Sequence, residues 1–160
     1  MGRESHATPT CPSVRQRTFD VEAAYLKGEF ENHQTLYARP PRGARYYVRG
    51  VPVIWRLRVP LYGEADAGRL WNRTFVRFLT GPIDGGGGGW SQSGYDPCYF
   101  FKILHDGSRI DMALYVDDGY VIDSGSPLAD AELTRLHDRF TIAIKNANFF
   151  LGNNVSIGAP

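Results

Sequence analysis

Two adjacent carboxylates, Asp117 and Asp118, end an apolar run and precede a glycine in Leu114-Tyr-Val-Asp-Asp-Gly119. This order predicts a tight hairpin turn of Asp117-Asp118-Gly119, with both acids at its tip. Adjacent carboxylates repel each other, so a cation that neutralises them would stabilise such a turn. Mg²⁺ is commonly held by a few carboxylates together with substrate phosphates. The alternative is an ordinary turn, because Asp and Gly are both favoured turn residues.

A two-metal site needs a further carboxylate from another strand, and Asp20 is the candidate. It lies in Phe19-Asp-Val21, where an acid inside strand composition is disfavoured without a purpose. Two metal ions about 3.5–4 Å apart would activate an attacking hydroxyl and stabilise a departing phosphate group. Taken alone, Asp20 also fits an exposed position or an edge strand.

Short strands and two helices are predicted to position these acids. Strands are expected at 17–21, 35–38, 53–59, 98–104, 109–116, 120–122, 149–151 and 155–157, with one helical turn at 23–26. Helices are expected at 65–80 and 128–140, because apolar residues recur there on one face. This mixed order predicts an α+β fold with a mostly antiparallel sheet.

The two helices are expected to cover one face of the sheet that carries Asp20 and the 109–122 hairpin. The side chains expected to be buried there are Trp71, Phe75, Phe78, Leu136 and Phe140, whereas Arg73 and Arg77 should stay exposed. Residues 1–16 are expected to be a disordered leader, residues 17–157 the folded domain, and 81–94 a flexible glycine-rich loop.

Composition favours one globular domain without a membrane segment. The chain has 160 residues, of which 42% are hydrophobic, and no apolar run reaches the roughly 20 residues that cross a bilayer. No signal peptide begins the chain, and two cysteines provide neither a disulfide framework nor metal-site spacing, so an intracellular protein is expected.

The net charge of +1 hides an asymmetry along the chain. Nine arginines lie between Arg39 and Arg77 with only two acids, Glu64 and Asp66, whereas eight acids lie between Asp106 and Asp138 with two arginines. A basic half could hold phosphates and an acidic half metal ions, while the alternative is two solvated faces of opposite sign.

Six segments form an ordered set of motifs. They are Phe19-Asp-Val-Glu-Ala-Ala-Tyr-Leu-Lys-Gly28; Leu36-Tyr-Ala-Arg-Pro-Pro-Arg-Gly43; Trp55-Arg-Leu-Arg-Val-Pro-Leu-Tyr-Gly63 with Ala67-Gly-Arg-Leu-Trp71; Tyr95-Asp-Pro-Cys-Tyr-Phe100; Tyr115-Val-Asp-Asp118; and Phe149-Phe-Leu-Gly152. In this order they resemble the palm of copia-like retrotransposon reverse transcriptases, which are RNA-directed DNA polymerases. The resemblance covers roughly residues 17–157.

The resemblance implies roles for individual residues. Asp20, Asp117 and Asp118 would be catalytic and, with the backbone of Val21, would bind two Mg²⁺ ions, with Mn²⁺ as a substitute. The incoming deoxynucleotide would be bound by Val21, Glu22, Ala23, Ala24 and Tyr25. Tyr25 would exclude a 2′-hydroxyl, although an aromatic there also fits ordinary core packing. Template and primer would contact Tyr62, Gly63, Arg69, Arg73 and Tyr115.

The implied partners are an RNA or DNA template with its primer, deoxynucleoside triphosphates and other parts of a retrotransposon polyprotein, with no membrane. The implied location is a cytoplasmic virus-like particle or the nucleus. Gly63-Glu-Ala-Asp-Ala-Gly68 departs from the family's Gly-Leu-Lys-Gln-Ala-Pro, and the five-glycine insert at 85–89 is atypical. A finger segment is expected before Asp20 and a thumb and RNase H after Ile157, so the chain is interpreted as a fragment that by itself extends a primer poorly.

Two alternatives remain. The first is an inactive palm relic that at most binds nucleic acid. The second, more remote, is a retroviral-type aspartic protease, because Asp123-Ser124-Gly125 resembles its active-site loop. That chemistry needs two such aspartates sharing a proton, which a dimer would supply.

Overall fold

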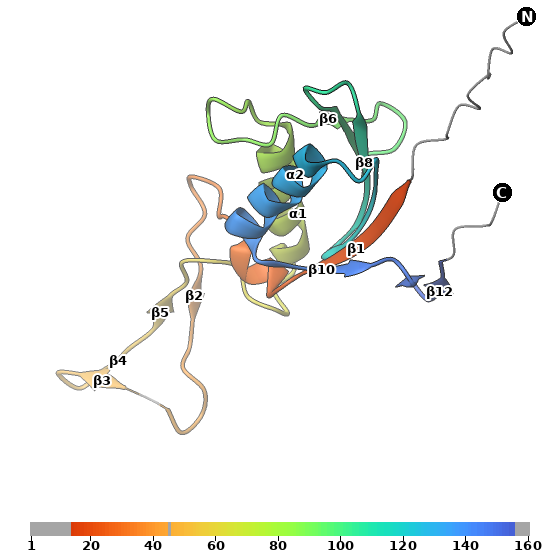
Figure 1. The fold of residues 1–160 in the computed structure, drawn as a ribbon. Helices are drawn as coiled ribbons and strands as arrows, with labels where there is room; N and C mark the ends of the chain where they lie inside the picture. The colour runs from red at the N-terminus through yellow and green to blue at the C-terminus, as the bar shows by residue number, and fades with distance from the viewer. Residues whose placement is uncertain (1–13, 45, 156–160) are drawn as a thin grey trace, which may run out of the picture.

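The computed structural model describes residues 14–44 and 46–155. A six-stranded antiparallel sheet has the strand order β10-β1-β9-β8-β7-β6 and carries two helices on one face (Figure 1). Its strands are β1 (Arg15–Val21), β6 (Ser91–Gln92), β7 (Tyr99–Ile103), β8 (Arg109–Tyr115), β9 (Asp118–Asp123) and β10 (Ile142–Asn146). The helices are α1 (Ala67–Thr80) and α2 (Pro127–Phe140), with a short 3₁₀ helix η1 (Ala24–Lys27). The expected α+β class is confirmed.

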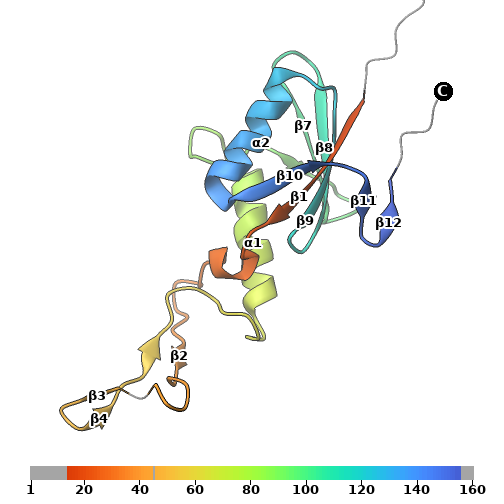
Figure 2. The same ribbon diagram turned by 60° about the horizontal axis from the view of Figure 1, so that its bottom comes forward.

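Strand periodicity separates a helix-covered face from an open face. In β1, Phe19 and Val21 are buried whereas Asp20 is exposed, because successive side chains of a strand point to opposite faces. Figure 2 shows both helices on the same side of the sheet. The open face is therefore the face on which a polar site can form.

The core lies between the sheet and the helices, as expected. The buried side chains there include Leu136 and three aromatic residues. The rings of Trp71, Phe75 and Phe140 pack with centroids 5.0–5.4 Å apart. Phe78 is only partly buried, and Arg73 and Arg77 are exposed. Burying one such large apolar side chain contributes about 1.5–3 kcal/mol relative to leaving it in water. The aromatic cluster therefore fixes α1 and α2 against the sheet.

The glycine-rich loop, which the sequence predicts to be flexible, is hydrogen-bonded to the end of α1 in the structure. Gly87 N–H donates to Pro82 O at 2.8 Å, Gly88 N–H to Phe78 O at 2.6 Å, and Trp90 N–H to Leu79 O at 2.8 Å. The loop thus folds back over the C-terminal end of α1. A Cβ at Gly87 would lie 2.3 Å from the carbonyl carbon of Gly81, so the absent side chain allows this close packing.

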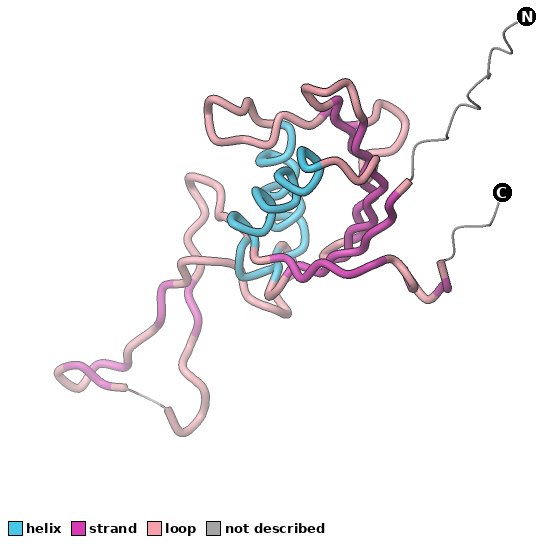
Figure 3. Tube along the Cα trace, viewed as in Figure 1, coloured by secondary structure: helices cyan, strands magenta, loops and turns pink. Residues whose placement is uncertain are grey.

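Residues 35–59 form an extended arm that projects from the body (Figures 1 and 3). It contains the two-stranded pairs β2 (Tyr37–Ala38) with β5 (Trp55–Arg56) and β3 (Tyr47–Val48) with β4 (Val51–Pro52). Arg49 and Gly50, both with positive φ, make the two-residue turn at its tip. Of the strand predicted over 53–59, only the two residues of β5 form, and both are exposed because this part of the arm does not pack against the core.

Other boundaries also differ from the sequence prediction. Strand β1 begins at Arg15, inside the predicted leader, while residues 1–13 lie outside the described residues. Strands β6 and β10 were not predicted. The final pair is β11 (Phe149–Phe150) with β12 (Asn153–Asn154), and Ser156 and Ile157 of the predicted strand lie outside the described residues. Within the described part of the chain, neither helix has the length and apolar character to cross a bilayer.

Candidate active site

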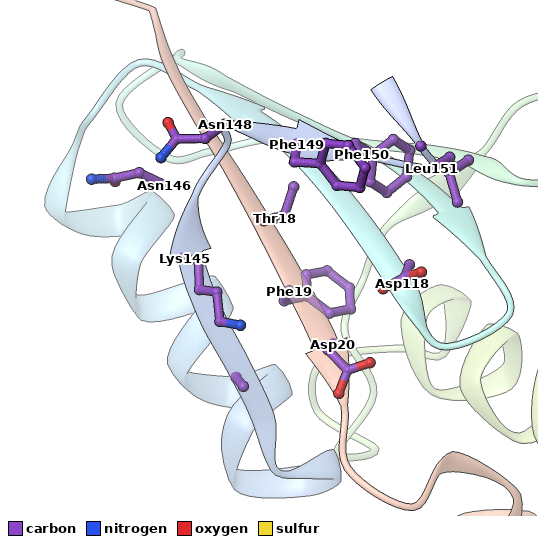
Figure 4. A pocket seen from close by; sticks show the side chains of 12 residues that line it. Thr18, Phe19, Asp20, Asp118, Lys145, Asn146, Asn148, Phe149, Phe150 and Leu151 are labelled. Carbon is purple, nitrogen blue, oxygen red and sulfur yellow. The ribbon is translucent and has the colours of Figure 1, made fainter. Parts of the chain in front are cut away.

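The open sheet face brings Asp20 and Asp118 side by side. The two residues are direct partners in the antiparallel pairing of β1 with β9, so their side chains leave the same face of the sheet. Both line a cleft of about 670 Å³, drawn in Figure 4. Asp20 is exposed and Asp118 half-buried. Two carboxylates from strands almost one hundred residues apart in sequence therefore share one surface.

The backbone holds Asp117 against the end of β1. Its carbonyl oxygen accepts a hydrogen bond of 3.0 Å from the N–H of Val21. The turn consists of Val116 and Asp117 and begins one residue earlier than predicted, because Asp118 already pairs with Tyr115. The register of β8 with β9 thus separates the two neighbouring acids: Asp118 is in the strand and Asp117 is in the turn.

Gly119 allows β1 and β9 to meet in this register. It is buried and lies opposite Phe19, whose ring crosses directly over it. A Cβ at Gly119 would lie 2.1 Å from Phe19 Cε1, closer than any real contact. The glycine of the Asp-Asp-Gly sequence is therefore needed for close packing, and the pairing of Asp20 with Asp118 depends on it.

A tryptophan of α1 fixes the turn from the helix side. The indole N–H of Trp71 donates to Val116 O at 2.7 Å. Val116 has a φ of 55°, which is unusual and strained for a β-branched residue. Sequence reasoning predicted Trp71 only as a core residue. The contact could have been anticipated, because the indole N–H of a buried tryptophan needs a hydrogen-bond acceptor.

The carboxylates repel one another. The pKa of Asp118 is raised above the ordinary aspartate value, first by burial and then by the negative charges of Asp117 and Asp20. Neutralising this group of charges would stabilise the site, and carboxylate oxygens are suitable ligands for Mg²⁺ or Mn²⁺. Among residues 14–44 and 46–155, no three His, Cys, Asp or Glu side chains are gathered into a complete metal-binding group. The pair fits a cation whose remaining ligands are substrate phosphates and water.

The expected nucleotide-binding segment lies directly after β1. Glu22 N–H donates to Thr141 O at 3.2 Å, Ala23 has a left-handed φ of 52° at the start of η1, and Ala24 is buried. Tyr25 is partly buried against the core and packs on Tyr62, with ring centroids 4.9 Å apart. The structure thus brings together Tyr25, which the resemblance implies for nucleotide binding, and Tyr62, which it implies for template contact.

The helix arginines expected at the template are already ion-paired. Arg69 pairs with Glu31 at 2.9 Å and with Asp66 at 3.3 Å, and the hydrogen bonds that it donates to Asp66 and Glu31 raise its pKa. Arg73 also pairs with Glu31. Asp66, one of the two acids at the departure from the family pattern, therefore has a structural partner. Of the expected template contacts, Tyr115 is exposed on the open face beside Asp118.

The cleft also contains residues that the sequence did not single out. Lys145 of β10 lies opposite Thr18 and on the same face as Asp20, and Phe149 and Phe150 close the far side of the cleft (Figure 4). The two-residue alternation in Ile142-Ala-Ile-Lys-Asn146 is weak but typical of a strand. Lys145 thus places a positive charge on the same face as Asp20 and Asp118.

The protease interpretation is contradicted at Asp123. This side chain is fully buried, and it binds Arg15 at 3.0 Å and Arg17 at 2.7 Å. It also accepts a 2.7 Å hydrogen bond from Gly125 N–H, and α2 follows directly. Both carboxylate oxygens of Asp123 are thus bound within its own chain, and the buried side chain cannot face a second aspartate across a dimer, as the protease site requires.

The family described as reverse transcriptase (RNA-dependent DNA polymerase) matches residues 13–159. Searches of curated proteins and of solved structures each found no significant match.

Proposed function

Because the chain belongs to the reverse transcriptase (RNA-dependent DNA polymerase) family, we propose that its open sheet face performs RNA-directed DNA synthesis by two-metal nucleotidyl transfer. The catalytic residues are Asp20, Asp117 and Asp118, and the parent element is of the copia-like type. The observation that carries this proposal is the direct pairing of Asp20 with Asp118, with a raised Asp118 pKa.

The reaction joins a primer to a deoxynucleoside triphosphate. The primer 3′-oxygen attacks the α-phosphorus, one P–O bond forms, the bond to the β-phosphate breaks, and pyrophosphate leaves while the hydroxyl proton is released. Mg²⁺ ions bound at Asp20, Asp117, Asp118 and the Val21 carbonyl would supply charge stabilisation for the attacking and leaving oxygens.

The chain's own residues would orient the reactants. The segment 21–25 would line the triphosphate, with Tyr25 against the sugar, and Tyr62 with Gly63 would contact the template. Tyr115, exposed next to Asp118, would contact the primer end. Lys145 adds a positive charge on the same face, where it would offset the charge of a bound triphosphate.

A metal titration tests the site most directly. Mn²⁺ binding to the full chain is followed by electron paramagnetic resonance for the wild type, Asp20→Asn and Asp118→Asn, with the exposed Asp138→Asn as the control. Loss of groups that merely support a ligand costs about 10- to 100-fold in metal affinity. We therefore expect both site variants to lose at least about tenfold. Unchanged affinity in Asp20→Asn and Asp118→Asn would reject the assignment.

Primer extension then separates an enzyme from the relic alternative. An RNA template with a DNA primer, one deoxynucleotide and Mn²⁺ or Mg²⁺ is used, and Asp117→Asn should abolish whatever incorporation the wild type shows. Metal binding at the pair without any Asp117-dependent incorporation, also when a finger segment from an intact relative is supplied, would favour a palm that binds but does not polymerise.

A further inference from the structure

The arm (residues 35–59) and the rest of the molecule carry opposite charges. The arm contains six arginines and no acid, so in a chain of net charge +1 the remaining residues together carry −5. The eight described arginines outside the arm are all ion-paired with carboxylates. The five described arginines of the arm are exposed and form no ion pair with a described residue: Arg39, Arg42, Arg49, Arg56 and Arg58. The arm and the body therefore offer charges of opposite sign to a partner.

The tip of the arm is a narrow hairpin whose apolar side chains face water. Arg49 and Gly50 form its turn, and the flanking Val48 and Val51 are paired with each other and 63% and 65% exposed. Strands β3 and β4 have only two residues each, and so short a hairpin is marginally stable in water unless it packs against something. An arginine between two exposed valines fits a partner surface that is both acidic and apolar.

The cleft on the open sheet face has both properties. Asp20 and Asp118 line it, and neither forms an ion pair with a described residue. Phe149 and Leu151, which also line it, are 59% and 45% exposed (Figure 4). Lys145 offsets only part of the negative charge. A guanidinium group carries its N–H donors in a planar fork that binds carboxylates strongly, so an arginine suits a site with two of them.

The cleft nearest to hand for the arm tip is that of another molecule. The tip, β3–β4, and the hairpin β11–β12 lie at opposite ends of the structure (Figures 1 and 2). Both residues of β11 line the cleft, so the cleft is on the side away from the arm. Two copies in antiparallel orientation would bring each tip to the other's cleft, and a twofold axis would make the two contacts identical.

We propose that two copies of the chain form a reciprocal dimer in which the arm tip of each enters the cleft of the other. Arg49 of one copy lies between Asp20 and Asp118 of its partner, and the two valines of the tip cover the apolar side of the cleft. The dimer itself requires only these charges and this apolar surface. Its consequence rests on the proposed function: an occupied cleft excludes metal ions and nucleotide, so the dimer must open before synthesis can begin.

Sedimentation velocity of the full chain tests the proposal. The protein is treated with nuclease and measured in EDTA at about 50 mM salt, where screening of charges is weak. Protein concentration is varied about a hundredfold, and the wild type should pass from monomer to dimer as it rises. Arg49→Glu and Asp20→Arg should each weaken the dimer at least about a hundredfold, because both contacts become repulsive.

Two matched controls separate a specific contact from a general effect of charge. Arg58→Glu changes the charge of the arm by the same amount, but at its base rather than its tip. Asp138→Arg changes the charge of the body by the same amount, on the exposed side of α2. Both controls should dimerise like the wild type.

An equimolar mixture of the two site variants gives the sharpest result. In a mixed dimer, the unchanged arm of Asp20→Arg meets the unchanged cleft of Arg49→Glu, while the two substituted side chains face each other with opposite charges. The mixture should therefore dimerise within about tenfold of the wild-type affinity, although neither variant does so alone. Two variants that had only lost their fold would not restore each other.

The apolar part of the contact is tested by Val48→Ser combined with Val51→Ser. The dimer would lose four buried valine side chains, two at each contact, so its affinity should fall at least about tenfold. The control is Ile103→Ser, because Ile103 is 58% exposed and lies outside both the arm and the cleft. Its dimer should be as stable as that of the wild type.

Several results would overturn the proposal. They are a monomer throughout the concentration range, equal weakening by the site variants and their controls, or a mixture that stays monomeric. A dimer seen only before nuclease treatment would assign the association to bound nucleic acid, and growth into larger assemblies would exclude a reciprocal pair. Because the assay contains EDTA, failure here leaves the metal-dependent proposal for the cleft untouched, and failure of the metal titration leaves the dimer untouched.

Discussion

At the scale of single residues, the cleft depends on one unfavourable group and one absent side chain. Asp118 carries a charge that burial and two neighbouring acids oppose. Gly119, its neighbour in β9, has no side chain where the ring of Phe19 passes. The repelled carboxylate of Asp118 favours cation binding. The missing side chain of Gly119 allows β1 and β9 to approach closely enough to bring Asp20 beside Asp118.

Asp118→Asn should stabilise the protein near neutral pH. A folded pKa above the ordinary value of 3.8 means that the folded state binds a proton more tightly than the unfolded chain. The ionised carboxylate therefore lowers stability above that range, and the penalty fades as the pH falls through the folded pKa. We expect a gain of up to about 1 kcal/mol at pH 7, the usual scale for a partly exposed charge interaction.

Urea denaturation at pH 7 and near pH 4 measures this effect, with Asp138→Asn as the control. The advantage of Asp118→Asn should shrink at the lower pH, and Mg²⁺ should stabilise the wild type more than the variant. An advantage of the same size at both pH values would show that repulsion is not its cause.

Gly119→Ala should be strongly destabilising. The added Cβ would overlap the Phe19 ring at 2.1 Å, and both residues lie in paired strands that cannot move independently. Overpacking of a core typically costs about 1–3 kcal/mol, and this contact should reach the upper part of that range. Gly94→Ala is the matched control, because nothing lies within 4 Å of its Cβ position. Thermal denaturation that gives both variants equal stability would contradict the close approach.

At the scale of elements, α1 does more than cover the sheet. Its Trp71 reaches the β8–β9 turn and satisfies the carbonyl of Val116, a residue in strained conformation. The helix thereby acts on the position of Asp117, although it supplies no group to the cleft. Trp71 is a positioning residue in this arrangement.

Trp71→Phe tests that role, with Trp90→Phe as the control. Trp90 is also buried, and it has no side-chain hydrogen bond to a described residue, so its replacement removes packing alone. Leaving the Val116 carbonyl unpaired should cost about 1–3 kcal/mol and loosen the turn. Mn²⁺ affinity should fall in Trp71→Phe and stay near the wild-type value in Trp90→Phe. Equal metal affinities in the two variants would restrict Trp71 to the core.

Helices and strands with a clear hydrophobic periodicity could be predicted from the sequence. A strand that is defined mainly by its pairing with a distant segment could not. The apolar face of 65–80 and the alternation of 109–116 correspond to α1 and β8 within two residues. Strand β10 was missed because its Ala143 to Asn146 are exposed, so its pairing with β1 leaves little apolar pattern. The motif residues Asp20 and Asp118 were identified from the sequence. Their direct pairing, the Trp71 contact and the place of Lys145 depend on register, which no local pattern encodes.

At the scale of the whole molecule, a buried ion network joins three elements. Asp123 at the end of β9 binds Arg15 and Arg17 of β1, and both arginines also bind Asp130 of α2 at 2.6 Å. Burial opposes ionisation of Asp130, but the arginine hydrogen bonds outweigh it and lower its pKa. The stability that Asp130 contributes is thus present at neutral pH and is lost as the pH falls through that lowered value.

Asp123→Asn should destabilise the whole fold. It removes the buried partner of Arg17, which is itself only 8% exposed, and leaves that guanidinium with Asp130 alone. Breaking one side of a buried pair typically costs about 3–5 kcal/mol. The exposed Asp138→Asn should cost almost nothing in the same urea denaturation. A cost for Asp123→Asn below about 1 kcal/mol, the value typical of surface pairs, would show that the network is solvated rather than buried.

The strand order also limits when the sheet can form during synthesis on the ribosome. Strand β1 is made first but lies between β9 and β10, whose pairing residues begin at Asp118 and Ile142. At about 5–20 residues per second, β1 leaves the ribosome several seconds before either neighbour exists. Its Phe19 and Val21 are without cover throughout that interval, and closing so long a loop is slow. Nascent chains should therefore need a holding chaperone until β10 has left the ribosome.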